Sequence, residues 1–408
     1  MTGGAVTATV SDGSAAFYNP AGLALSDRNR IDVSASAYGL RFYSVESFLS
    51  VKGGPAKDAS VTEFVAIPTQ IAYARKFGER WTLGVGYFVP RASNTLLSER
   101  LGGVAASGTA STMALDARVS SASSWLTAAA AVQLSPRLRL GFAVFGVYDE
   151  SVQSTTFFGS VQENAVTQKA LEFTSLGTST QISSTLGVGA QFDPSPSVSL
   201  GLWARGPQLR ILTSGSTSTN LVGGSPGPDG TPLVVADSSE VPNGERTGFL
   251  TLGRYVGALA YRTGATMISV EGDVQPGLRS ERTGVDRRFT LNARAGVTYR
   301  VGESILLGAG AFTDRSVDAQ PAFRIDYYGG TLGVELADVL ALARGEPRQQ
   351  RDSLMLTSVF ALRYAYGHGR TDTLVADPSA DLANTLSFEN HTQSAHEFSL
   401  HVGSSLRF

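Results

Sequence analysis

The sequence contains no cysteine in its 408 residues. This excludes thiol nucleophiles, disulfide bonds and metal sites with cysteine ligands. Charged residues are also scarce, at 17%, and the formal net charge is −2. Because nucleic-acid-binding proteins carry a basic excess on one face, we predict no nucleic-acid partner.

Long apolar runs are missing as well. No stretch of about 18 apolar residues is present, which excludes a transmembrane helix. The opening MTGGAVTATV lacks the basic and apolar regions of a secretory signal peptide. For an exported protein, we therefore expect either a processed chain or a start codon assigned too late.

Alternation of apolar and polar residues is the main pattern that is present. In the last segment, one face carries Phe398, Leu400, Val402, Leu406 and Phe408, and the other face is polar. Period-two alternation is typical of β-strands with two different environments. Together with a mean hydropathy of +0.01, it favours an all-β, up-and-down antiparallel transmembrane barrel with apolar residues toward lipid and polar residues toward the lumen.

The alternating segments predict about fourteen strands, near 31–45, 63–77, 80–90, 119–134, 137–150, 178–193, 197–213, 246–262, 265–276, 286–301, 304–315, 324–340, 352–367 and 391–408. Every second connection is tight, at 78–80, 135–136, 193–196, 263–264 and 302–303, with 341–351 as a longer exception. The others are longer, at 46–62, 91–118, 151–177, 214–245, 277–285, 316–323 and 368–390.

Short periplasmic turns that alternate with long outer loops are typical of bacterial outer-membrane barrels. This sorting predicts the outer membrane as the location, with both termini in the periplasm. We expect the Gly-, Ser- and Pro-rich loop at 214–245 to be exposed and poorly ordered.

Residues 1–30 do not alternate and are too small and polar to form a lipid-facing strand. The lumen of a fourteen-stranded barrel is too wide to be filled by wall side chains. We therefore predict two parts, an N-terminal plug or hatch at 1–30 and the barrel at 31–408.

The segment SDGSAAFYNPAGLA at 11–24 resembles the hatch of the FadL/TodX family of outer-membrane transporters for long-chain fatty acids and hydrocarbons. Segments 191–207 and 258–262 also look like barrel repeats of that family. The resemblance implies a fourteen-stranded barrel with an Asn-Pro-Ala hatch in its lumen, which corresponds here to Asn19, Pro20 and Ala21. A related set of plugged barrels with a similar segment serves protein secretion and surface attachment.

Two groups of residues become candidates for the transport path. The first is the hatch, where Phe17 and Tyr18 are expected to line a ligand pocket beside Asn19, Pro20 and Ala21. Asn-Pro is also a common turn opener in ordinary loops.

The second group is Gly84, Gly86 and Pro90, in the segment WTLGVGYFVP. Glycine within a strand often marks a bulge, and proline removes a ladder donor. These residues serve either close packing of the plug or, as the resemblance implies, a kink that opens a lateral gap into the bilayer.

The predicted loop at 91–118 carries Leu96, Leu97 and Leu101 at helix-like spacing. These leucines either pack the loop against itself or form an extracellular landing groove for hydrophobic ligands. The sequence favours the first interpretation.

No catalytic or metal site is predicted. The segment 223–227 matches the G-x-S-x-G pattern of hydrolases, but Pro226 removes the backbone N–H that an oxyanion hole needs. Alternation on one strand places His391 and His401 on one face and His396 on the other, so they do not converge on a metal.

The sequence therefore predicts a channel that is not an enzyme and has no cofactor. We expect passive uptake of hydrophobic small molecules, namely long-chain fatty acids or hydrocarbons, with lateral exit into the bilayer. The expected partners are that ligand, outer-membrane lipid and lipopolysaccharide, and the expected state is a monomer. The alternative is a non-transporting plugged barrel that anchors or escorts secreted proteins.

Overall fold

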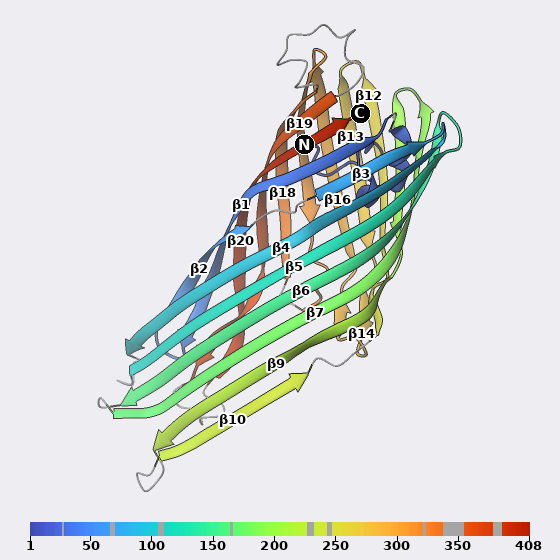
Figure 1. The fold of residues 1–408 in the computed structure, drawn as a ribbon. Helices are drawn as coiled ribbons and strands as arrows, with labels where there is room; N and C mark the ends of the chain where they lie inside the picture. Colours follow the sequence, from blue (N-terminus) through green and yellow to red (C-terminus); the bar gives the residue numbers. More distant parts are fainter. Residues whose placement is uncertain are drawn as a thin grey trace.

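The computed structural model describes residues 1–26, 28–65, 70–104, 110–163, 166–226, 232–242, 247–320, 324–337, 355–377 and 386–408. Almost all of this chain is β-strand (Figure 1). Two short helices lie near the N-terminus, α1 (Ala15–Tyr18) and the 3-10 helix η1 (Pro20–Leu25). The strands are β1 (Arg30–Val51), β2 (Ala56–Val65), β3 (Gln70–Phe77), β4 (Trp81–Val104), β5 (Ala110–Gln133), β6 (Leu138–Glu163), β7 (Val166–Ser195), β8 (Val198–Arg205), β9 (Gln208–Pro226), β10 (Pro232–Pro242), β11 (Gly248–Thr251), β12 (Arg254–Thr263), β13 (Thr266–Gln275), β14 (Leu278–Ser280), β15 (Val285–Arg287), β16 (Thr290–Val301), β17 (Ile305–Asp314), β18 (Arg324–Leu336), β19 (Met355–Ala376) and β20 (Leu386–Arg407).

All described strands except β14 and β15 belong to one sheet that closes on itself, because β20 pairs antiparallel with β1 from Arg30↔Arg407 onward. In three places, consecutive strands along the chain together occupy one strand position of the wall. Both β2 and β3 pair with β1, both β8 and β9 pair with β7, and β10, β11 and β12 pair with the β8–β9 strand. This leaves about fourteen positions around the wall, and the predicted up-and-down barrel is confirmed.

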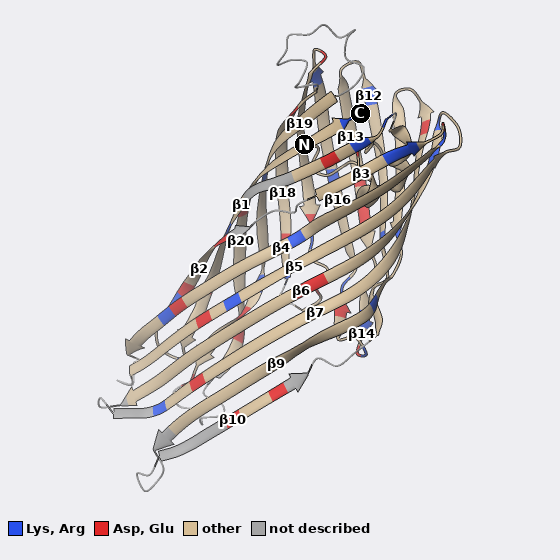
Figure 2. Ribbon diagram, viewed as in Figure 1, with Lys and Arg blue, Asp and Glu red and all other residues tan. Residues whose placement is uncertain are grey.

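The outward face of the wall is apolar. Along β4, Leu83, Val85 and Tyr87 point outward and are exposed, and Phe398 and Leu400 do the same on β20, as alternation predicts. Charged residues are few along β4–β7 and do not gather into a charged face (Figure 2). An exposed apolar wall with a closed hydrogen-bond ladder is the form in which strands cross a bilayer.

Among the described residues, no helix has the length and hydropathy needed to span a membrane.

The predicted tight turns are confirmed at one end of the barrel. Only a few residues separate β3 from β4, β5 from β6, β7 from β8, β12 from β13 and β16 from β17. Gly264 and Gly302 adopt positive φ values of 55° and 64° in two of these turns, a conformation that glycine reaches without steric cost. The predicted longer connection at 341–351 lies outside the described residues.

The prediction of long loops at the other end is wrong for most of their length. At 91–118, 151–177 and 214–245, the described residues are largely strand, because β4 to β7, β9 and β10 continue far beyond the predicted ends. The Ser- and Thr-rich sequences there lack the clear alternation of the lipid-facing wall. They still pair, since Thr and other β-branched residues fit a pleated sheet well. Part of 214–245, at 227–231 and 243–245, lies outside the described residues.

The long strands form an extension of the barrel with its own apolar core. Strands β4 to β7 and β9 pack against β1 and β19 through buried side chains, and Leu49–Val51 of β1 also pair in parallel with Leu374–Ala376 of β19. The fully or nearly buried residues are Leu49, Val51, Leu101, Met113, Phe157, Leu171, Leu374 and Ala376. This extension core lies toward the end of the barrel opposite the tight turns.

We predict that Phe157→Ala loosens the extension without opening the barrel wall. Phe157 is 2% exposed within the extension core, and truncating a buried phenylalanine costs about 3–5 kcal/mol. Its neighbour Phe158 points outward and is 43% exposed. Hydrogen exchange should therefore accelerate in the outer parts of β5 to β7 in Phe157→Ala and remain unchanged in Phe158→Ala. Equal exchange in the two variants would contradict a shared core.

Candidate functional site

The first 26 residues, here called the N-terminal segment, lie inside the barrel against glycines of the wall. A Cβ atom added to Gly141 would lie 2.3 Å from the backbone nitrogen of Ala21. The added atom would lie within 2.6 Å of the segment's backbone at Gly201, Gly296 and Gly310, and 2.0 Å from the Asn19 side chain at Gly189. Backbone can approach backbone this closely only where the wall has no side chain. The wall is therefore shaped to accept this segment.

Asn19 is fully buried and holds the turn between α1 and η1. Its Oδ1 accepts a hydrogen bond from the backbone N–H of Ala21 at 3.2 Å, so the side chain caps η1, and Pro20 occupies the first helical position. Its Nδ2 donates to the carbonyls of Thr7 (2.8 Å) and Ala190 (3.2 Å). One side chain thus ties the turn to the rest of the segment and to β7.

Two wall carboxylates bind backbone N–H groups of the segment. The Oε2 of Glu271 accepts from Val6 (3.1 Å) and Thr7 (3.0 Å), and the Oδ2 of Asp32 accepts from Gly13 at 2.6 Å. Each carboxylate is also paired with an arginine on the wall, Glu271 with Arg294 and Asp32 with Arg30. Charge-assisted hydrogen bonds of this kind are stronger than neutral ones.

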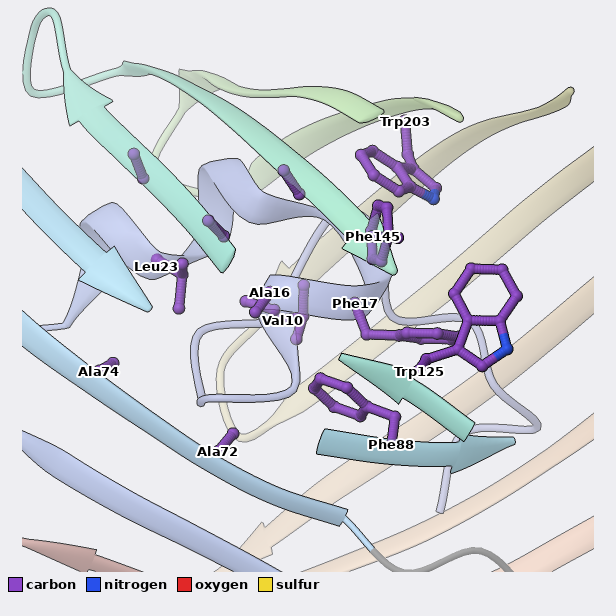
Figure 3. Close-up of a cluster of buried hydrophobic side chains, with 14 of the residues drawn as sticks. Val10, Ala16, Phe17, Leu23, Ala72, Ala74, Phe88, Trp125, Phe145 and Trp203 are labelled. Atoms are coloured by element: carbon purple, nitrogen blue, oxygen red, sulfur yellow. The ribbon is translucent and has the colours of Figure 1, made fainter. Parts of the chain in front are cut away.

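Phe17 of the segment packs against a cluster of aromatic residues of the wall (Figure 3). Its ring centroid lies 5.0 Å from that of Phe88, 5.5 Å from Trp125 and 6.1 Å from Phe145. Trp203 extends the cluster at 6.1 Å from Phe145. These separations lie in the range favoured by aromatic pairs. We call Phe17, Phe88, Trp125, Phe145 and Trp203 the aromatic cluster.

Two polar groups border the aromatic cluster. The guanidinium carbon of Arg205 lies 4.6 Å from the Trp125 ring centroid, a cation–π contact. Tyr18 packs edge-on to Phe17 at 5.3 Å and remains 43% exposed. The cluster thus joins apolar rings to a positive charge and an accessible phenol.

The predicted kink does not lie at Gly84 and Gly86. The ladder between β3 and β4 is regular from Trp81 to Phe88, and the register of β4 against β5 shifts between Phe88 and Arg91, around Pro90. Gly84 packs against the segment, since an added Cβ would lie 2.9 Å from Leu23. Gly86 leaves room for the Phe88 ring of the aromatic cluster. Only Pro90 coincides with a break in the strand.

An inner cavity of about 680 Å³ lies beyond Pro90, toward the extension. Apolar side chains of β1, β2, β4 and β5 form one side of it. The hairpin of β14 and β15 and the following loop form another side, with Arg287 and Asp318 among the lining residues. Arg288 ties this hairpin to the wall through Asp326 and through the carbonyl of Ser316.

The three leucines predicted on a loop lie instead on β4, so their spacing is not helical. Leu96 points outward and is 66% exposed, Leu97 lines the inner cavity, and Leu101 is buried in the extension core. Neighbouring residues of a strand point to opposite faces, so the three do not share one groove.

Phe88, Trp125, Phe145 and Trp203 were missed by the sequence reasoning. Each lies at a position whose alternation points it into the lumen, where polar or small residues are usual. A large aromatic residue with inward phase was the signal that could have identified them. No cluster of potential metal ligands is found in the described part of the chain, and Gly223–Pro226 of the G-x-S-x-G pattern is regular strand.

We predict that Gly141→Val displaces the N-terminal segment. The new side chain would overlap Pro20 and Ala21, whereas Gly146 on the same strand has no atom near its Cβ position. Hydrogen exchange at Phe17–Leu25 should therefore rise at least about tenfold in Gly141→Val and stay unchanged in Gly146→Val, while both proteins keep heat-resistant barrels. Unchanged exchange in Gly141→Val would contradict the docked position of η1.

Docking of the segment should also depend on pH through Asp12. Loss of hydration raises the pKa of this carboxyl above its ordinary value, and the nearby Asp32 raises it further. The docked state thus favours protonated Asp12. Docking therefore begins to weaken above the pKa of an undocked Asp, about 4, and continues to weaken until the pH passes the raised pKa of the docked state. Asp12→Asn should remove this part of the pH dependence, because asparagine does not titrate. Its amide oxygen can still accept from Ser14, so the local structure is kept. Exchange at residues 13–19, followed against pH in both proteins, should show a difference that grows with pH, and parallel profiles would contradict it.

No family model matches the sequence, and no curated protein sequence matches it significantly. Solved structures do match over nearly the whole chain. A FadL homologue from Pseudomonas aeruginosa has a TM-score of 0.59 at 13% identity, covering 100% of this chain and 96% of that one. The toluene transporter TodX from Pseudomonas putida has a TM-score of 0.56 at 14% identity, covering 97% and 94%. The toluene transporter TbuX from Ralstonia pickettii has a TM-score of 0.51 at 12% identity, covering 100% and 96%. This chain therefore has the fold of the FadL and TodX channels.

Proposed function

We propose that this protein is an outer-membrane channel for passive uptake of hydrophobic small molecules. The observation that carries the proposal is the aromatic cluster, which joins Phe17 of the N-terminal segment to four wall residues inside the barrel. The shared fold with transporters of toluene and with a FadL homologue supports the same ligand class. Long-chain fatty acids and aromatic or aliphatic hydrocarbons are the candidate ligands.

The inner cavity and the aromatic cluster serve as successive ligand positions. The cavity offers Val45, Val61, Leu97 and Val119 as apolar contacts. Transfer of a ligand from water to such a surface yields roughly 25 cal/mol for each Å² of apolar area buried. The hatch around Asn19 and Pro20 then controls passage between cavity and cluster. No energy source is needed, because the ligand moves down its gradient.

The break at Pro90 marks the lateral exit. Outward residues of β4 are apolar up to Tyr87, so the break begins at the edge of the lipid-facing wall. A ligand that leaves there passes from the interior into the bilayer without crossing water. Gly84 and Gly86 contribute by making room for Leu23 and Phe88 rather than by bending the strand.

We propose that the protein lies in the outer membrane as a monomer, with both termini periplasmic. The tight turns and the two ends of the chain all lie toward one end of the barrel (Figure 1). Short turns are the periplasmic ends of such barrels. The extension then faces the medium, where lipopolysaccharide surrounds the base of the extension.

Uptake should fall when the aromatic cluster is opened. Phe17→Ala removes about 40 Å² of apolar ligand contact, which corresponds to roughly a fivefold loss of uptake at 25 cal/mol per Å². Leu126→Ala is the control, because Leu126 points to lipid and is 67% exposed. The measurement is uptake of a labelled long-chain fatty acid and of labelled toluene by cells that lack their own transporter.

The outcomes separate the two functions. Uptake by the wild type that Phe17→Ala reduces and Leu126→Ala preserves supports transport. If the wild type takes up neither ligand and instead retains a secreted protein at the cell surface, transport is wrong and the escort function replaces it.

A further inference from the structure

Within the described residues, two neighbouring strands of the wall face each other along a long seam without a ladder. From Trp81 to Phe88, β4 pairs with β3, but within the described residues no ladder pair joins β4 to β2, although the two strands lie side by side. Beyond Arg91, β4 pairs only with β5, and β2 pairs only with β1. We call this boundary, between β2 and the part of β4 from Arg91 to Val104, the β2–β4 seam.

Side chains bridge the seam at two places. Near its start, the Oε1 of Glu63 on β2 accepts a hydrogen bond from the backbone N–H of Asn94 on β4 at 2.6 Å. Near its far end, Lys57 pairs with Glu99 at 2.8 Å and donates to the carbonyl of Arg100 at 3.0 Å. The Lys57 side chain is 44% exposed, and ion pairs in water contribute little. The Glu63 contact is the stronger of the two, because the Glu63 side chain is completely buried.

Glu63 is held firmly on its own side of the seam. The Tyr43 hydroxyl donates to its Oε2 at 3.3 Å, and the guanidinium of Arg41 lies 3.6 Å from the same oxygen. Both residues belong to β1, where Arg41 is the ladder partner of Glu63 and also binds Glu397 at 2.7 Å. The carboxylate is therefore fixed to β1 and β2 and reaches across to β4 through a single bond.

The seam separates the inner cavity from the outside of the wall. Ala59 and Val61 of β2 line the cavity on one side of the seam, and Arg91, Thr95 and Leu97 of β4 line it on the other. Separation of the two strands at Glu63, the end of the seam nearest the lipid-facing wall, would open the cavity sideways while every ladder of the barrel stayed intact. The cost there would be a side-chain bond instead of a row of backbone bonds, and Leu101 at the far end of β4 would stay in the extension core with Leu49 and Val51.

We propose that the Glu63 carboxylate is the latch of a lateral door formed by β2 and β4. This inference rests on the proposed function, since it assigns the moving part of the lateral exit. Glu63 is a positioning residue that keeps the seam closed until a ligand in the cavity displaces β4. The weaker pair of Lys57 and Glu99 follows the movement and does not control it.

The chain has no cysteine, so Thr95→Cys places a single thiol behind the door. In vesicles, a maleimide attached to a lipid headgroup should label this thiol slowly while the latch is closed. Adding Glu63→Ala should raise the labelling rate about tenfold, the effect of losing one charge-assisted hydrogen bond. Adding Glu63→Gln should leave the rate within about twofold of the parent, because its amide oxygen can still accept from Asn94. Glu99→Ala, on the exposed end of the seam, is the matched control and should also change the rate by less than about twofold.

Labelling is measured without ligand and is therefore independent of transport. Equal rates in the parent and in Glu63→Ala would overturn the latch and leave the proposed function standing, and so would an equal rise in Glu99→Ala. Faster labelling in Glu63→Ala only, with no uptake of any ligand by the wild type, would keep the latch and reject transport. Retained heat-resistant migration of Glu63→Ala shows that the barrel is folded. If this variant does not fold, Asn94→Pro removes the donor N–H of the same bond on β4 and should raise the labelling rate likewise.

Discussion

The closed ladder of backbone hydrogen bonds is the constraint on which the whole structure depends. A strand in lipid has no water to bind its N–H and C=O groups, so every edge must be paired. Pairing of β1 with β20 closes the sheet into a barrel and fixes which residues face outward. The apolar outer surface, the enclosed lumen and the inward-pointing residues all follow from this closure.

Closure also explains how the interior is organised. Since the wall satisfies its own backbone, its inward side chains are free to bind the N-terminal segment. Glu271 and Asp32 accept its backbone N–H groups, and Asn19 of the segment donates to the wall in return. Wall glycines provide the space, and Phe17 completes the aromatic cluster. The segment is thus held by directional polar bonds at its borders and by apolar packing at its centre.

Where strands of the barrel face each other without ladder pairs, apolar packing and side-chain bonds hold them together. In the extension, apolar packing between strands that face each other replaces the surrounding lipid, with Phe157 and Met113 among its most buried residues. At the β2–β4 seam, the bond from Asn94 to Glu63 and the contacts of Lys57 with Glu99 and Arg100 stand in place of a ladder. The inner cavity borders both regions, because its lining includes Ala59 and Val61 of β2 and Leu97 of β4.

The sequence by itself determined the barrel, and it set residues 1–30 apart as a segment that does not alternate. Alternation along β4 and β20 is a local property, so the outward direction of Leu83 or Phe398 could be predicted from neighbouring residues. The positions of the glycine turns and the lack of alternation in residues 1–30 are local properties too, so they could be predicted in the same way. The resemblance at 11–24 added the expectation that Asn19 and Pro20 form a turn inside the lumen, and the capping role of Asn19 follows from its residue type.

Only the tertiary structure decided what the inward residues contact. Leu96, Leu97 and Leu101 look equivalent in sequence, yet they face the outside, the inner cavity and the extension core. Glu63 and Asn94 meet because β1 to β4 curve around one wall, and no local pattern connects them. The aromatic cluster likewise joins residues far apart in the chain. Such contacts depend on the register and curvature of the closed sheet, which are collective properties of all its strands.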